Sequence, residues 1–305
     1  MSVLTNSRLG RRGFLQVATT AAGAFAVAGV RSAHADEQPL LPRSSDAVLK
    51  LSSQEGIIPG DSLREKVLRM EEWGFVGIEP GGGGLPNRIN EFQEALKGTQ
   101  VKVSAICAGF RGAPISDNLE QRELAVRTTK EILSAAGELG STGMIIVPAF
   151  NGQTKLDHVE GRKVLLDVLR DLGDHAKKSG TRVLLEPLNR GEAWFLRMLA
   201  DAAAICRDVN HPGVCMMGDF FHMNIEETSD MGAFLSAGKY LHHVHLASGR
   251  RVMPGQDDRS FVNGFKALKA LGYSDYCSLE CGCDGDRMIE IPKSVAFLQK
   301  QWAEA

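Results

Sequence analysis

The sequence predicts a (β/α)8 barrel, which is a closed parallel sheet surrounded by helices. Short apolar runs alternate with longer amphipathic ones about eight times along the chain, which is typical of a parallel sheet covered by helices. Most of the short runs are hydrophobic throughout, as strands buried on both faces are. An open doubly wound sheet has the same alternation, so the placement of polar residues at the ends of the later runs favours the barrel.

The strands are expected where the short apolar runs lie, at residues 48–53, 75–80, 101–108, 144–150, 182–188, 214–221, 242–247 and 276–281. The first helix is expected to begin at Ser62, because Glu65 three residues later forms a capping box with it. Its buried face is expected to hold Leu63, Val67 and Met70.

Two more helices are indicated by spacing. The last one, near residues 291–302, would close the ring of helices. Another is expected over residues 158–178, where apolar residues recur at near-helical intervals at Val164, Val168, Leu172 and Ala176. No linker divides the chain after residue 35, so residues 36–305 are expected to form a single barrel domain.

The first 35 residues resemble a twin-arginine export signal. They contain no acidic residue, Arg11 and Arg12 precede an uncharged stretch over residues 17–30, and small residues follow at 33–35. That stretch is short against the ~20 residues that a spanning helix needs, so cleavage and release are expected and a stable membrane anchor is not. The mature enzyme would then be periplasmic, or otherwise exported by the twin-arginine route.

Charge and cysteine usage exclude other classes of protein. Removing residues 1–35 removes four arginines and takes the formal charge from −2 to −6. A negative net charge argues against binding of nucleic acid, so no nucleic-acid partner is expected. The six cysteines are too few and too irregularly spaced for a disulfide scaffold, so buried free thiols are expected. Cys281 and Cys283 lack the second pair that a soft-metal site would need.

Four residues that commonly bind metal ions stand at the ends of four successive strands. They are Glu186, Asp219, His245 and Glu280, at intervals of 33, 26 and 35 residues. Each interval fits one strand, loop, helix and return, so the four side chains are expected to point into one mouth of the barrel. Three carboxylates and one imidazole suit Mn²⁺, Mg²⁺ or Co²⁺, and Zn²⁺ is compatible with them.

Each of these residues has an ordinary explanation when it is taken alone. Asp219 could cap a helix, and His245 could be a hydrogen-bonded core histidine. Together they favour a metal site, because carboxylates buried at apolar strand ends cost several kcal/mol each unless they are paired or metal-bound.

Three stretches of this half of the chain resemble the xylose-isomerase-like barrel superfamily. They are EPLNRGE at residues 186–192, DFFHMNIEE at 219–227 and HVHLASGRRVMPGQDD at 243–258. The resemblance is strongest to the D-tagatose 3-epimerase and D-psicose 3-epimerase branch, with hydroxypyruvate isomerase nearby. In the first half of the barrel only the alternation of strands and helices resembles the family.

The resemblance implies a sugar isomerase or epimerase that holds one divalent metal ion, with Mn²⁺ expected. Such enzymes abstract a proton beside a ketone and form an enediolate held on the metal. The matching positions imply that Glu186, Asp219, His245 and Glu280 bind the metal and that Glu186 and Glu280 are also the catalytic acid and base.

The same resemblance implies that Glu192, His222 and Arg251 contact oxygens of a carbohydrate substrate. The adjacent Arg250 leaves open which of the two arginines reaches the site. Relatives commonly form homodimers or tetramers, so a homo-oligomer is expected.

The sequence departs from the epimerase pattern near the second strand. Glu79 and Pro80 are followed by four glycines at residues 81–84, which suggests a flexible lid or a slack loop.

On the seventh strand, His243 and His245 should point to one side and His242 to the other, with His243 deeper in the core.

Three functions follow from these features. The first is a ketose 3-epimerase or an aldose–ketose isomerase, the second a metal-dependent lyase acting on 3-keto-glycosides, and the third a sugar-binding barrel without catalysis. The export signal favours extracytoplasmic substrates such as oxidised glycosides or keto-sugars over the free or phosphorylated ketoses of the cytoplasm.

Overall fold

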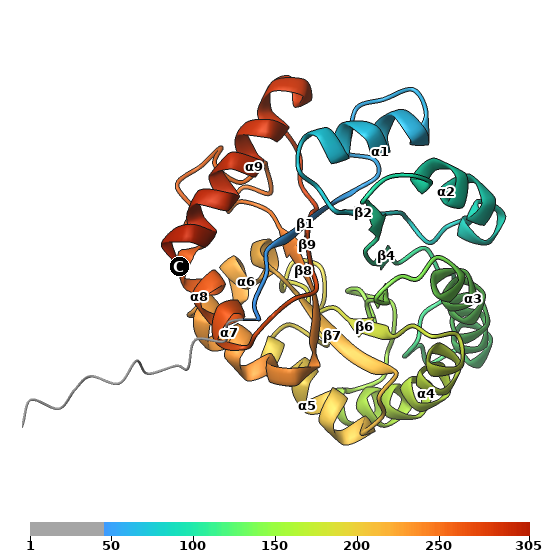
Figure 1. Cartoon of the computed structure of the whole chain (residues 1–305). Helices are drawn as coiled ribbons and strands as arrows, with labels where there is room; N and C mark the ends of the chain where they lie inside the picture. Colours follow the sequence, from blue (N-terminus) through green and yellow to red (C-terminus); the bar gives the residue numbers. More distant parts are fainter. Residues whose placement is uncertain (1–45) are drawn as a thin grey trace, which may run out of the picture. The chain divides into compact units, whose positions relative to one another are not determined.

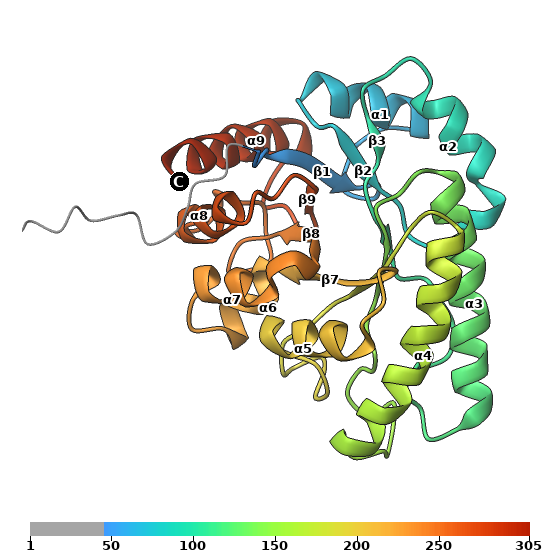
Figure 2. The same cartoon turned by 60° about the horizontal axis from the view of Figure 1, so that its bottom comes forward.

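A parallel barrel ringed by helices forms residues 46–305, the part of the chain that the computed structural model describes (Figures 1 and 2). The export segment expected at residues 1–35 lies outside this part. The strands are β1 (Lys50–Gln54), β2 (Gly77–Glu79), β3 (Lys102–Val103), β4 (Ile106–Cys107), β5 (Met144–Ile146), β6 (Val183–Leu185), β7 (Val214–Asp219), β8 (Leu241–Leu246) and β9 (Tyr276–Leu279). Every strand pair in this sheet is parallel, so the predicted barrel is confirmed.

Helices follow most of the strands and lie outside the sheet (Figure 1). They are α1 (Leu63–Glu72), α2 (Ile89–Leu96), α3 (Leu119–Glu138), α4 (His158–Lys178), α5 (Leu199–Val209), α6 (Phe220–Glu226), α7 (Asp230–Ala237), α8 (Val262–Ala270) and α9 (Arg287–Glu304), with short 3-10 turns at Leu85–Asn87 and Gly238–Tyr240. None of these helices combines the length and apolar character that crossing a membrane requires.

The third predicted strand, residues 101–108, is split into β3 and β4, and these two pieces stand at the two ends of the sheet order. The reason is a change of hydrogen-bonding partner. The Ser104 amide still donates to the Ile78 carbonyl of β2, whereas the Ile106 amide donates to the Gly143 carbonyl beside β5. A bridge between Gly81 and Cys107 then joins β2 to β4 and closes the ring. Nine short strands therefore make up the eight staves that the sequence predicts.

Local sequence explains where the helices begin. The Ser62 hydroxyl accepts the Glu65 amide and caps α1, as predicted, while the Glu65 carboxylate accepts the Asp61 amide. Helix α4 covers the predicted residues, and Leu172 and Ala176 are buried as predicted. In the earlier turns Leu165 and Leu169 are buried instead of the predicted Val164 and Val168, which lie at the edge of the core.

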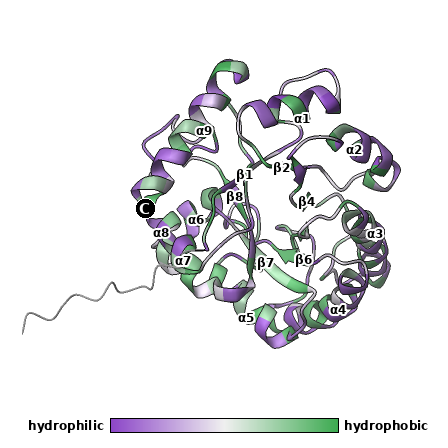
Figure 3. Cartoon of the chain, viewed as in Figure 1, coloured by the Kyte–Doolittle hydropathy of each residue, from purple (hydrophilic) through white to green (hydrophobic). Residues whose placement is uncertain are grey.

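An aromatic cluster supports the turn from β7 into α6. The Phe220 ring is fully buried and lies 4.8 Å from that of Phe261, 5.2 Å from that of Phe234 and 5.9 Å from that of Phe265. Phe220 directly follows Asp219, so this packing fixes the backbone that carries the carboxylate. In Figure 3 hydrophobic and hydrophilic segments alternate along the outer helices, as expected of amphipathic helices packed on a barrel.

A register shift between β7 and β8 determines which residues of the two strands lie opposite each other. The pairing of β7 with β8 shifts between Met216 and Met217, so that Met217 lies opposite His243 and Asp219 opposite His245. The predicted alternation is confirmed: His243 and His245 are fully buried, while His242 is partly exposed and bonds Asp275 on the other side, with Nδ1 to Oδ2 at 2.7 Å.

The His242–Asp275 pair should make stability depend on pH. Burial alone would lower the pKa of His242, but hydrogen bonds to Asp275 and Cys215 raise it to about 9. The pair should therefore stabilise the fold fully below pH ~6.5 and lose that effect as the pH rises through about 9. In Asp275→Asn we expect this part of the free energy of unfolding, on the order of 1 kcal/mol, to disappear. Urea unfolding of both proteins at pH 6 and pH 10 measures it, and equal pH slopes would contradict it.

Candidate active site

The structure brings the four predicted ligands together at the carboxyl ends of their strands. Asp219 ends β7, His245 lies one residue before the end of β8, and Glu186 and Glu280 directly follow β6 and β9. One ligand atom from each of the four lies within 4.8 Å of the other three. All four side chains are buried except that of Glu280, which is 19% exposed. The mouth of the barrel therefore holds a compact group of three carboxylates and one imidazole.

The imidazole of His245 is central to this group. Its Nδ1 lies 3.0 Å from Glu280 Oε2 and 3.7 Å from Glu186 Oε1, and it has no good hydrogen bond. Glu186 Oε1 and Asp219 Oδ2 are likewise buried without a hydrogen-bond partner among residues 46–305. The second oxygen of Asp219 accepts the Phe221 amide at 2.7 Å and caps α6. The helix cap considered for Asp219 is thus real, but it leaves one oxygen of the carboxylate free.

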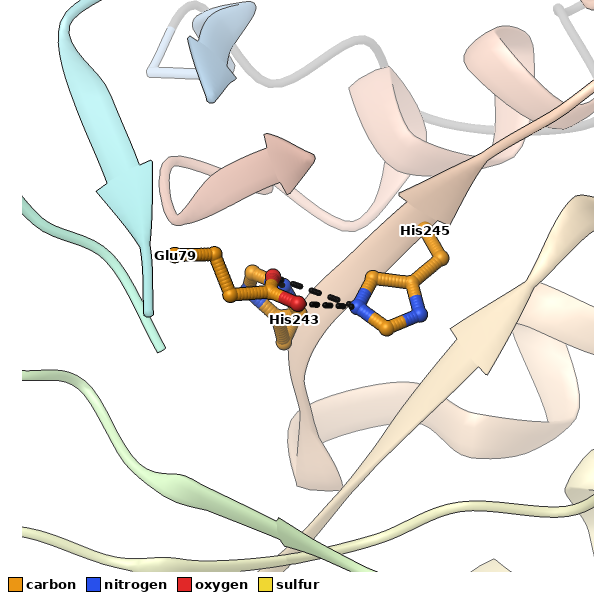
Figure 4. A group of neighbouring side chains, drawn as sticks. All are labelled: Glu79, His243 and His245. Atoms are coloured by element: carbon orange, nitrogen blue, oxygen red, sulfur yellow. Dashed lines mark hydrogen bonds and ion pairs between the residues drawn. The ribbon is translucent and has the colours of Figure 1, made fainter. Parts of the chain in front are cut away.

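Glu79 is a functional candidate that the sequence reading did not assign to the site. Its fully buried carboxylate ends β2 and accepts from His243 Nε2 at 2.7 Å and from His245 Nε2 at 3.0 Å. Figure 4 shows this carboxylate between the two imidazole rings. Its position at a strand end, the same signal that identified the four ligands, was present in the sequence.

Gln54 connects Glu79 to Glu280. It ends β1 directly opposite Glu79 in the sheet, and its side-chain Nε2 donates to Glu280 Oε1 at 2.7 Å and to Glu79 Oε1 at 3.1 Å. The first half of the barrel therefore contributes the residues that hold the ligands of the second half.

The structure shows which of the two arginines reaches the carboxylates. The Arg251 guanidinium lies over the Phe221 ring, and its Nη2 is 2.7 Å from Glu280 Oε2 and 3.7 Å from Asp219 Oδ2. Arg250 is mostly exposed and pairs with Asp284 instead. The backbone of Arg251 has a φ of 57°, an unusual conformation that turns the side chain back toward the cluster.

Of the other two predicted substrate-binding residues, one lies in the cluster and one at its rim. His222 Nε2 is 3.4 Å from Asp219 Oδ2, and its Nδ1 accepts from the backbone amide of Asn189 at 3.3 Å. Its Nε2 faces the carboxylates and also lies 3.2 Å from Arg251 Nη1. Glu192 is 44% exposed, accepts from the Asn189 side chain at 2.8 Å and approaches His222 no closer than 3.9 Å.

Burial dominates the electrostatics of the site. It raises the pKa of Glu186, and it raises that of Asp219 to about 8. Burial acts on Glu280 in the same direction, but the charge and hydrogen bond of His245 and the charge of Arg251 bring its pKa to about 2. Burial and the nearby Arg251 lower the pKa of His222 to about 3, so this imidazole is neutral.

The histidine at the centre behaves differently. Burial alone would lower the pKa of His245, but the charges of Glu79 and Glu280 raise it well above its usual value. A cation bound beside Nδ1 would replace the proton on that atom, as metal binding at a histidine does.

The donor set fits a divalent cation. Three atoms, Glu186 Oε1, Asp219 Oδ2 and His245 Nδ1, are buried without a hydrogen bond and lie close to one another, and such atoms destabilise a fold unless something binds them. Carboxylate oxygens with one imidazole nitrogen are suitable ligands for Mn²⁺, Mg²⁺, Co²⁺ or Zn²⁺.

In the glycine run after β2, packing requires glycine at one position, Gly82, while a Cβ on Gly81, Gly83 or Gly84 would meet no atom within 4 Å. A Cβ on Gly82 would lie 2.0 Å from the Ala108 carbonyl oxygen, and the Gly82 amide donates to the Cys107 carbonyl at 3.0 Å. Glycine is required here because the chain passes close to β4 where the barrel closes. All six cysteines are free, as predicted, but only Cys206, Cys215 and Cys277 are buried. Cys281 and Cys283 have different contacts, Met253 and the Gly285 carbonyl.

Similarity to known proteins identifies the family. Residues 67–301 match the family described as "Xylose isomerase-like TIM barrel". The chain is 35% identical over 242 residues to the 3-dehydro-D-guloside 4-epimerase of Escherichia coli K12, an alignment that covers 76% of this chain and 92% of that one. It is 34% identical over 115 residues to the D-psicose 3-epimerase of Ruminiclostridium cellulolyticum, covering 38% and 39%.

Solved structures agree. The apo crystal structure of the E. coli 3-keto-D-glucoside 4-epimerase superposes with a TM-score of 0.78 at 31% identity, covering 83% of this chain and 100% of that one. A structure of L-ribulose 3-epimerase superposes with a TM-score of 0.74 at 20% identity and supports the fold alone. The chain therefore belongs to the xylose isomerase-like TIM barrel family. It is an isomerase, similar to the sugar epimerases of that family.

Proposed function

We propose that this protein is a divalent-metal-dependent epimerase that inverts the carbon next to a ketone in a keto-sugar glycoside. The observation that carries the proposal is the group of buried ligand atoms at the barrel mouth, three of them without a hydrogen bond, with Glu186 and Glu280 directly after strands that are not neighbours. The glycoside is proposed from the similarity to the E. coli 4-epimerases of 3-keto-glycosides.

Glu186, Asp219, His245 and Glu280 would hold the cation, and Mn²⁺ is the ion that we propose. When bound, the cation supplies a Lewis acid that stabilises negative charge developing on a substrate oxygen. This makes a carboxylate strong enough as a base, because a C–H bond beside a carbonyl is otherwise too weak an acid for it.

Two carboxylates are needed to invert a stereocentre, one to take the proton from one face and one to return a proton to the other. Glu186 follows β6 and Glu280 follows β9, with β7 and β8 between them in the sheet. A sugar ring bound at the mouth would have one carboxylate on each side. A proton relayed on one side only would give an aldose–ketose isomerase instead.

The surrounding side chains would bind and orient the sugar. His222 Nε2 faces the cluster, where it can form a hydrogen bond with a hydroxyl group of the sugar. Arg251 can donate to a second oxygen from the opposite loop. Glu192, at the rim, can accept from a hydroxyl group of the sugar.

Space beside the cluster suits a glycoside. A cavity of about 290 Å³ extends toward β1 and β2, and its lining includes Gln54, Lys66, Glu79 and Cys107. Gln54 and Glu79 also hydrogen-bond Glu280 and His245, so the group attached to the reacting ring could extend toward this cavity.

A ketose 3-epimerase is the second candidate, favoured by the 115-residue similarity to the R. cellulolyticum enzyme. Both candidates exchange one proton with solvent. Purified protein loaded with Mn²⁺ should therefore be incubated in D₂O with 3-keto-glucosides and, separately, with free ketoses.

Deuterium entering C4 of the keto-glycoside, with inversion there, supports the first candidate. Deuterium at C3 of a ketose supports the second. Loss of the aglycone, seen by mass spectrometry, would instead identify a lyase, and no exchange with either panel would contradict both epimerase proposals.

We further propose that the mature protein acts outside the cytoplasm, from the twin-arginine pattern at the start of the chain. Replacing Arg11 and Arg12 by lysine should leave the precursor inside the cell. Cell fractionation and immunoblotting measure this, with the unchanged chain as the control. Equal export of both forms would contradict the proposal.

A further inference from the structure

Glu79, His243 and His245 form a second group of side chains that could hold a metal ion. Their contacts argue against that use. Glu79 Oε2 lies 2.7 Å from His243 Nε2, whereas ligand atoms bound at ~2.0 Å around a tetrahedral ion lie roughly 3.3 Å apart. The short distance is that of a hydrogen bond with a proton between the atoms. The group is therefore a hydrogen-bonded network that lies behind the candidate metal site.

We propose that Glu79 is a positioning residue, which holds His245 so that its Nδ1 faces the cation. This inference rests on the proposed metal site. An imidazole nitrogen that donates a hydrogen bond cannot bind a metal, so the partner of one nitrogen determines what the other can do. Glu79 Oε1 is 3.0 Å from Nε2 of His245, which places the N–H on that side of the ring. Nδ1 then faces Glu186 and Glu280, and it is the ring nitrogen that a cation between these residues would bind in place of a proton.

The surroundings of Glu79 make it an acceptor and nothing else. Three nitrogens surround its carboxylate, the Nε2 atoms of Gln54, His243 and His245, at 3.1, 2.7 and 3.0 Å. The residue is 1% exposed, so water does not compete for these bonds. Two imidazole N–H groups and one amide N–H need acceptors here, and only a carboxylate offers an oxygen to both histidines.

The same carboxylate also influences Glu280. Gln54 uses one side-chain nitrogen for both Glu79 Oε1 and Glu280 Oε1, so that Glu79 orients His245 directly and Glu280 through Gln54. Residues from β1 and β2, which supply no cation ligand in the proposed site, thus orient two of its four ligands.

The first test reads the protonation of His245 without any substrate. Protein with ¹⁵N-labelled histidine is examined by long-range ¹H–¹⁵N NMR, with His245→Asn to assign the signals. We expect a protonated Nε2 before and after Zn²⁺ is added, and a change of the Nδ1 signal on addition. An unprotonated Nε2 in the parent protein would overturn the proposal, and this holds even if variants at position 79 fail to fold.

The second test is Glu79→Gln, which keeps the shape but leaves one oxygen for two imidazole N–H groups. We expect the Kd for Mn²⁺, measured by competition with a chelating dye, to rise roughly 10 to 100-fold. The matched control is Asp275→Asn, which removes another carboxylate–histidine bond at β8 but on its outer side, through His242. It should bind Mn²⁺ like the parent.

The outcomes distinguish the positioning role of Glu79 from the proposed epimerase reaction. An Mn²⁺ affinity of Glu79→Gln within twofold of the parent would overturn the positioning role. Parent protein that binds Mn²⁺ tightly, with the expected NMR signals, but exchanges no proton of any keto-sugar would overturn the proposed reaction and leave the role of Glu79 supported.

Discussion

Glu186→Gln and Glu280→Gln should each lower kcat for epimerisation about 10³-fold, within the range of 10² to 10⁴ that a positioned acid or base contributes. Glutamine keeps the size of the side chain but can neither take up nor return the proton. Because inversion uses both faces of the carbon, losing either carboxylate should stop the reaction. The measurement is the initial rate of epimer formation, at Mn²⁺ concentrations shown to saturate each variant.

A matched control is Glu227→Gln. Glu227 is a partly buried glutamate outside the cluster, and it accepts the Leu199 amide at 2.8 Å. Its kcat should stay within about twofold of the parent, as expected for a change outside the reacting centre. If either cluster variant kept more than a tenth of the parent kcat with metal bound, the two-carboxylate mechanism would be wrong.

Asp219→Asn should abolish the stabilisation that the metal gives to the fold. In the parent, Mn²⁺ at 100 times its Kd should add about 2.7 kcal/mol to the free energy of unfolding and raise Tm by roughly 5 to 10 °C. Asparagine can still accept the Phe221 amide, so α6 keeps its cap. It replaces the free carboxylate oxygen by a neutral group, and we expect Mn²⁺ to shift its Tm by less than about 1 °C at the same concentration.

Differential scanning fluorimetry with and without Mn²⁺ measures this, with EDTA-treated protein as the reference. The EDTA-treated proteins also show how much the buried carboxylate of Asp219 destabilises the fold when no metal is bound. Metal-free Asp219→Asn should be at least as stable as the metal-free parent, because Asp219 Oδ2 is fully buried without a hydrogen bond. An equal Tm shift by Mn²⁺ in both proteins would place the ion elsewhere.

The fold class and the four candidate ligands could be predicted from the sequence because both depend on a regular repeat of strands along the chain. Strands buried on both faces must be apolar throughout, and a barrel brings the end of every strand to one mouth, so residues such as Asp219 and Glu280 could be related by their spacing alone. The splitting of residues 101–108 into β3 and β4 could not be predicted, because it results from a change of hydrogen-bonding partner where the barrel closes.

The sequence by itself determined the barrel, the convergence of Glu186, Asp219, His245 and Glu280, and the family. Only the tertiary structure decided that Arg251, and not Arg250, reaches the carboxylates, and that Glu79 holds His243 and His245 from the other side of the barrel. The physical reason is that period and spacing specify which side of an element a residue occupies. Partners 164 and 166 residues apart, and the direction of a loop side chain, depend on how the whole ring closes.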